Sequence, residues 1–303
     1  MEENKQDLLL LQAQQAVDER AWSQALALYE ELYQLEQNLA VNQQLVNLAV
    51  RLEQFQLAQQ YLLDYVEKYL STSDDVDNVI LIFTKNQNYI ICHEVINKIT
   101  GPTLYQHAQQ ELALKEDEAR LILQATFKAR MREFKYLGIH DFAAQYHSYQ
   151  TGLQLPLREH IAIAKTLLLD EDVSDLVRIT ILASFMALKI KEDVSFLWLD
   201  NEIYTRKFSD LVPPLATETA FIIQDTLYDE LGDTDPVTLA GLEQNIILRI
   251  KAAFPFVEQV ITDPVTWTKY QIARFRGEEL PDLNENDIRW LLKFDALFAK
   301  IGN

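Results

Sequence analysis

Two stretches of the chain repeat one pattern and decide the fold class: residues 12–33, QAQQAVDERAWSQALALYEELY, and residues 45–66, LVNLAVRLEQFQLAQQYLLDYV. In each copy an aromatic residue opens a second helix, an alanine follows three residues later, and large side chains follow four and seven residues after that. Such spacings lie on one face of an α-helix. With the first residues of the two copies aligned, the equivalent positions are Ala16 and Ala49, Val17 and Val50, Trp22 and Phe55, Ala25 and Ala58, Tyr29 and Leu62, and Leu32 and Tyr65.

This pattern resembles the tetratricopeptide repeat (TPR) family, whose second helix carries a small residue, a large one four positions on and an apolar one three further. In the first copy Ala25, Tyr29 and Leu32 take these places. The first helix departs from the family, because Leu9 and Ala16 stand where Trp and Tyr are usual, and the Pro at the repeat end is missing. The resemblance implies an α-solenoid of stacked helix pairs with a concave groove.

A third, degenerate copy falls in the apolar stretches 76–83 and 89–99, which a polar break at 85–88 separates. Gly101-Pro102 then predicts a helix stop. Three helix pairs fill residues 5–100, so the sequence predicts a TPR-like domain at 1–100 and a helical domain at 101–303. When the same offset is added once more, the positions that match the pattern are Val79, Ile82, Ile91 and Val95.

The second domain is predicted to be helical without a period. Helices are expected at 103–114, 117–137, 140–150, 215–231 and 285–301, and Asp235-Pro236 and Asp263-Pro264 predict two helix starts with Asp at the N-cap and Pro at the first helical position. The acidic turn 170–172, followed by Val177-Arg178, resembles HEAT-type helix pairs, whose Arg often bonds back to the acidic turn. An ordinary helical hairpin is the alternative, so this domain is HEAT-like or irregular.

Residues 194–208, VSFLWLDNEIYTRKF, predict the one β-hairpin. Two β-rich runs flank Asp200-Asn201, a dipeptide able to take the positive φ angles of a tight turn. A frayed helix is the alternative reading. The fold class is therefore all-α with one small hairpin.

Composition limits the function classes. The 46 acidic and 27 basic residues give a net charge of −19, which repels phosphate backbones and anionic lipid, so neither nucleic acid nor a membrane is an expected partner. No apolar run approaches the length of a membrane span, and the N-terminus lacks the basic start of a signal peptide. The single cysteine, Cys92, excludes an internal disulfide and favours a reducing compartment. We expect a cytoplasmic protein.

No catalytic signature is present. The chain lacks the phosphate-binding, dinucleotide, zinc-protease and nucleophile-elbow motifs, and its 7 glycines are spread singly. His140 and His147 are seven residues apart, whereas metal ligands on one helix stand three or four apart. Cys92 is expected to be a buried structural thiol. The cations Lys128, Arg130, Arg132 and Lys135 are expected to pair with neighbouring carboxylates, and docking of an acidic tail or an RNA phosphate is the alternative. We expect no catalytic residues, no metal and no cofactor.

The TPR resemblance implies a peptide groove lined by the first helix of each pair. Amides such as Gln14 and Asn47 could bond the main chain of an extended peptide. Leu10 and Gln43 stand where a carboxylate clamp would have lysines, so a chaperone-tail clamp is disfavoured. The candidate groove residues are Leu10, Gln14, Val17 and Asp18, then Gln43, Asn47, Val50 and Arg51, then Val76, Ile80 and Phe83.

The sequence thus favours a non-enzymatic scaffold that binds a protein or peptide. In the alternative for the groove itself, its amides merely solubilise an inner face packed on later helices. Two other functions stay open: a regulatory sensor for a small peptide or metabolite, and an enzyme with an unrecognised site.

Overall fold

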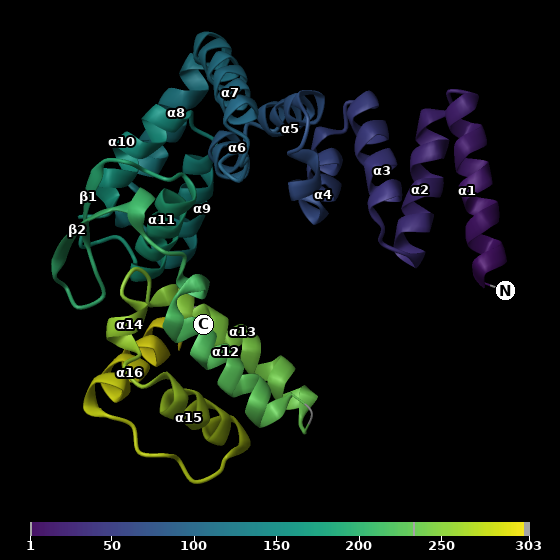
Figure 1. Cartoon of the computed structure of the whole chain (residues 1–303). Coiled ribbons are helices and arrows are strands. Elements are labelled where there is room, and N and C mark those ends of the chain that lie inside the picture. The colour runs from purple at the N-terminus through teal and green to yellow at the C-terminus, as the bar shows by residue number, and fades with distance from the viewer. Residues whose placement is uncertain (1, 233, 300–303) are drawn as a thin grey trace. The chain divides into compact units, whose positions relative to one another are not determined.

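The computed structural model describes residues 2–232 and 234–299, and the side chains from residue 5 onward. Within these residues the chain forms sixteen α-helices and one two-stranded antiparallel sheet, so the predicted all-α fold with a small hairpin is confirmed (Figure 1). The chain divides into two compact units: Met1–Leu137 with Tyr146–Ile163, and Gly138–Gln145 with Ala164–Asn303. The predicted boundary after residue 100 falls inside the first unit.

Unit 1 begins with three helix pairs, in which each helix packs against the next along the chain (Figure 1). A short 3-10 helix, η1 (Val66–Tyr69), lies between the second and third pairs. The pairs are α1 (Glu2–Asp18) with α2 (Trp22–Leu35), α3 (Leu39–Arg51) with α4 (Phe55–Asp64), and α5 (Ser73–Lys85) with α6 (Tyr89–Ile96).

One backbone turn joins the two helices of every pair. Arg20, Glu53 and Gln87 adopt positive φ angles of 59°, 57° and 59°. In each case the next amide donates five residues back to a helix carbonyl: Ala21 N to Ala16 O at 2.8 Å, Gln54 N to Ala49 O at 2.8 Å, and Asn88 N to Phe83 O at 2.9 Å. These bonds satisfy carbonyls that a helix end leaves free. The interval from Glu53 to Gln87 is one position longer than that from Arg20 to Glu53. Since α3 and α5 both have 13 residues, the extra residue precedes α5 and shifts the third pair by one position along the chain.

This register makes Cys92 the equivalent of Ala25 and Ala58. All three are fully buried, near the start of the second helix of their pair. A small side chain lets two helices approach closely. Burial raises the pKa of the Cys92 thiol above its ordinary value, so the cysteine is the small packing residue of the third pair, as the expectation of a structural thiol required.

Unit 1 continues with α7 (Pro102–Ile122) and α8 (Gln124–Lys135). The predicted break between residues 114 and 117 is wrong, because α7 runs through it. Glu116 is buried there: its Oε1 lies 2.9 Å from His93 Nε2 and accepts the Leu157 amide at 2.9 Å. The acidic run 116–118 therefore contains a buried carboxylate that ties three segments together.

Unit 2 contains the sheet. Helices α9 (Phe142–Leu153) and α10 (Leu157–Leu167) are shared between the units, and α11 (Asp175–Ala187) precedes β1 (Asp193–Leu197) and β2 (Ile203–Lys207). The strands pair from Asp193 with Lys207 to Leu197 with Ile203. The predicted hairpin is confirmed, but only Asn201 of its turn has a positive φ, 66°, because the loop spans five residues and closes through Trp198 N to Glu202 O.

The remaining helices of unit 2 are α12 (Glu218–Leu231), α13 (Pro236–Ala252), α14 (Val257–Val260), α15 (Pro264–Arg276) and α16 (Glu285–Ala299). Both predicted Asp-Pro starts are confirmed: the Asp235 and Asp263 carboxylates each accept an amide of the first turn at 3.1 Å. Arg178 donates to Asp170 O at 2.7 Å, so it does bond back to the acidic turn, through the backbone. No helix in the described part of the chain is long and apolar enough to span a membrane.

Candidate functional site

A hollow of about 470 Å³ lies between the first two helix pairs of unit 1. Its walls come from the end of α1, the start of α2 and the second half of α3. Four of the predicted groove residues line it: Val17, Asn47, Val50 and Arg51. The other lining residues are Trp22, Gln44 and Leu48. This hollow is the candidate binding site.

Arg51 and Trp22 form the hollow's most specific feature. The Arg51 guanidinium carbon lies 4.4 Å from the centroid of the Trp22 ring, a cation–π contact that holds the flexible cation in place. Within the described residues Arg51 forms no ion pair, although it is exposed. A stacked guanidinium without a carboxylate keeps its donors free for a ligand.

The amides of the hollow are equally free. Asn47 is exposed and Gln44 lies one helical turn before it, and neither side chain bonds to another described part of the protein. Each amide offers two donors and an acceptor. Together with the apolar floor of Val17, Leu48 and Val50, they form a surface that could bond a peptide main chain and cover an apolar side chain.

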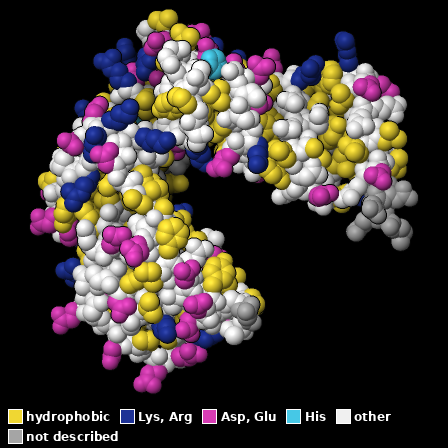
Figure 2. All heavy atoms as spheres, in the orientation of Figure 1, with side chains coloured by type: hydrophobic (Ala, Val, Ile, Leu, Met, Phe, Trp, Pro, Cys, Tyr) yellow, Lys and Arg dark blue, Asp and Glu magenta, His cyan; other side chains and the backbone are white. Residues whose placement is uncertain are grey.

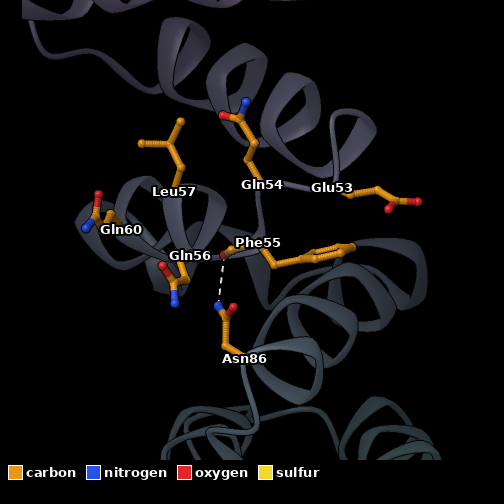
Figure 3. A pocket seen from close by; sticks show the side chains of 7 residues that line it. All are labelled: Glu53, Gln54, Phe55, Gln56, Leu57, Gln60 and Asn86. Carbon is orange, nitrogen blue, oxygen red and sulfur yellow. Dashed lines mark hydrogen bonds between the residues drawn. The ribbon is translucent and has the colours of Figure 1, made fainter.

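A second hollow of about 460 Å³ lies at the turn between α3 and α4. Its lining is mostly amide: Glu53, Gln54, Phe55, Gln56, Leu57, Gln60 and Asn86. Figure 3 shows Asn86 reaching from the end of α5 to the start of α4, where it donates to Phe55 O at 2.8 Å. The same amide nitrogen donates to Gln59 Oε1 at 2.8 Å. Because its best amide is already engaged, this hollow is the weaker candidate.

The remaining predicted residues lie elsewhere. Leu10, Gln14, Asp18 and Gln43 are exposed on α1 and α3, outside the first hollow. Phe83 is 0% exposed and packs in the core with Val76 and Ile80, so none of the three is free to line a groove.

The one-residue shift of the third pair explains this difference. Repeating the interval from Val17 to Val50 once more gives Phe83, whereas the turn geometry makes Thr84 the equivalent of Val50 and Lys85 the equivalent of Arg51. One residue rotates a helix position by about 100°. That rotation carries Phe83 from the expected groove to the core.

The basic stripe of α8 also differs from expectation. Lys128, Arg132 and Lys135 are exposed, and within the described residues none forms an ion pair with a carboxylate. Lys135 instead lies 5.6 Å from the Tyr136 ring. Figure 2 shows Lys and Arg side chains gathered in the region of α8, on a face where Asp and Glu are scattered widely.

Two buried histidines of unit 1 are held by neighbouring groups. His93 is held by Glu116, and His160 is fully buried with Nδ1 2.9 Å from Gly152 O and its ring stacked 5.1 Å from Phe134. Desolvation lowers the pKa of His160 to about 4, so the ring is neutral at pH 7 and Nδ1 carries the proton. In the described residues no three His, Cys, Asp or Glu side chains are grouped to hold a metal ion.

The sequence pattern placed Trp22 at the start of a second helix, and the predicted groove residues did not include Gln44. No sequence signal pointed to Trp22, because its contact with Arg51 joins side chains on different helices. Comparison with protein-family models, with curated proteins and with solved structures found no match for this chain.

Proposed function

We propose that this chain is a non-enzymatic scaffold that binds a peptide segment of a partner protein in the hollow between its first two helix pairs. The observation that carries the proposal is the stacked, carboxylate-free Arg51 over Trp22, beside the unbonded Asn47 amide. The recurring turn of the three pairs favours TPR-like stacking, in which such a surface receives an extended peptide. We place the protein in the cytoplasm, in keeping with its single buried cysteine.

The chemistry of the hollow defines the peptide. A guanidinium over an indole favours a carboxylate, either an acidic side chain or a chain terminus. The amides favour main-chain hydrogen bonds, and the apolar floor accepts one aliphatic side chain. The peptide is therefore expected to pair an acidic residue with an aliphatic residue.

A displayed peptide library tests this proposal. We expect selection on the wild-type protein to enrich acidic–aliphatic sequences. Arg51→Ala should weaken binding of the selected peptide about tenfold or more, since a hydrogen bond to a charged group contributes roughly 1.5–3 kcal/mol. Asn47→Ala removes a hydrogen bond to the neutral main chain, worth roughly 0.5–1.5 kcal/mol, and should weaken binding about threefold to tenfold. The matched controls Gln14→Ala and Gln43→Ala remove exposed amides outside the hollow and should change the affinity less than about twofold. Enrichment of no common sequence, or equal binding by the hollow variants and the wild type, contradicts the proposal.

The regulatory-sensor alternative is favoured by a separate observation, an apolar cavity in unit 2.

A further inference from the structure

A third cavity, chemically different from the two hollows of unit 1, lies between α12 and α13 of unit 2 and has a volume of about 150 Å³. The two helices run side by side (Figure 1). From α12 it is lined by Ala220, Ile223 and Leu227, which share one helical face at spacings of three and four. All three are at least nine-tenths buried. A cavity of about 150 Å³ with aliphatic walls has room for about one benzene-sized ring.

The α13 wall is aliphatic except at one position. Leu239, Ile246 and Ile250 share a stripe with Glu243, and all four line the cavity. Glu243 is partly buried, yet within the described residues its carboxylate has no hydrogen bond and no ion pair. An ionised carboxylate placed among aliphatic side chains loses hydration without compensation.

Of the five cations on α13 and α15, all but Lys251 are paired with other carboxylates of the described residues. Arg249 pairs with Asp295 at 2.6 Å, Arg276 with Asp235 at 2.9 Å and Lys269 with Glu230 at 3.1 Å. Within the described residues Glu243 is therefore the carboxylate of this cavity that lacks a counter-ion. The exposed side chains of Gln224 and Tyr228 mark the side on which the cavity opens to solvent.

We propose that this cavity binds a small amphipathic amine, with its apolar body between α12 and α13 and its ammonium group on Glu243. The volume between the aliphatic walls limits the apolar body of the ligand to about one ring, and the unpaired carboxylate favours a positively charged head group. The inference is independent of the peptide site in unit 1, because it uses different residues and a different ligand class.

Three compounds with the same phenylethyl body and different head groups test the charge requirement: phenethylamine, phenethyl alcohol and 3-phenylpropionate. By titration calorimetry on the full chain we expect phenethylamine to bind at least tenfold more tightly than the alcohol, and the acid not to bind. Glu243→Gln should remove the preference for the amine over the alcohol. The matched control Asp229→Asn, which removes an exposed carboxylate of α12 outside the cavity, should leave it unchanged.

A cavity-filling variant tests whether the ligand binds in this cavity without changing the charge of Glu243. Ala220→Leu should abolish binding of both the amine and the alcohol, with far-ultraviolet circular dichroism verifying that the variant is folded. Equal affinities for the three compounds, no binding of the amine, or an unchanged amine preference in Glu243→Gln would overturn the proposal. Retained binding in a folded Ala220→Leu protein would place the ligand elsewhere and overturn it too.

Discussion

The turns inside the helix pairs of unit 1 and the capped helix starts of unit 2 show two ways of passing from one helix to the next. In unit 1 one backbone turn recurs three times although its central residue changes from Arg20 to Glu53 to Gln87. In unit 2 the same backbone turn ends α11 at Lys189 and α15 at Gly277, but the starts of α13 and α15 depend on particular side chains, the Asp235 and Asp263 caps. A turn built from backbone bonds tolerates sequence drift, whereas a turn built from side chains does not.

The strongest test of this comparison concerns the one-residue shift in the third pair. Phe83→Ala should lower the free energy of unfolding by about 3–5 kcal/mol, because it empties a fully buried aromatic position. Leu81→Ala, at the partly buried equivalent of Asn47, should cost clearly less. Urea denaturation measures both. Equal losses of stability, or a smaller loss for Phe83→Ala, would support the alignment at a constant 33-residue period and contradict the alignment based on the turns.

The next test removes a side-chain junction of unit 2. The buried Asp287 accepts the Thr262 amide at 3.0 Å, the Thr262 hydroxyl at 2.8 Å and the Asp263 amide at 3.2 Å. Asp287→Ala leaves these donors without a partner and should cost about 3 kcal/mol. The exposed neighbour Glu285→Ala should change stability by less than about 0.5 kcal/mol. A loss below about 1 kcal/mol in Asp287→Ala would show that the junction does not depend on this carboxylate.

The buried His160 makes the stability of unit 1 depend on pH. The folded-state pKa of His160 in unit 1 is about 4, below its ordinary value of 6.5. Between these values the unfolded chain binds a proton that the folded chain excludes, so stability is full above pH 6.5 and falls as the pH drops toward 4. The expected slope approaches about 1.4 kcal/mol per pH unit, so stability at pH 5 should be roughly 2 kcal/mol below that at pH 7 from this group alone.

His160→Asn keeps a donor for Gly152 O and should flatten this part of the pH profile, measured as urea midpoints from pH 7 to pH 4.5. The matched variant His140→Asn changes an exposed ring and should keep the wild-type slope. A His160→Asn protein with the same slope as the wild type would assign the acid sensitivity to other groups.

The smallest expected effect concerns the recurring turn itself. Glu53 is exposed at a φ of 57°, a conformation that costs a residue with a Cβ roughly 1 kcal/mol and costs glycine nothing. Glu53→Gly should therefore raise stability by about 0.5 kcal/mol, seen as a higher thermal midpoint. Gln60→Gly, inside α4, should lower stability by about 1 kcal/mol. A loss in Glu53→Gly would show that its side chain, rather than the backbone, maintains the turn.

The candidate site was predictable in part. The spacing of Val17, Asn47, Val50 and Arg51 along first helices placed them together, and the structure brings them into one hollow. Phe83 was wrongly assigned to the groove, because an alignment at a constant 33-residue period cannot detect a single inserted residue. The contact of Arg51 with Trp22 joins side chains on different helices, and a sequence pattern carries no information on such a pairing.

By itself the sequence determined the all-α class, the three helix pairs, the Asp-Pro helix starts and the β-hairpin, since each follows from local spacing, capping and turn chemistry. Only the tertiary structure decided which face of α5 is buried, which amides of α3 remain free, and that Glu116 is a core residue while Glu243, among the described residues, lacks a counter-ion. These properties depend on which side chains meet across elements distant in sequence. Tertiary packing determines those side-chain contacts, and local propensity does not.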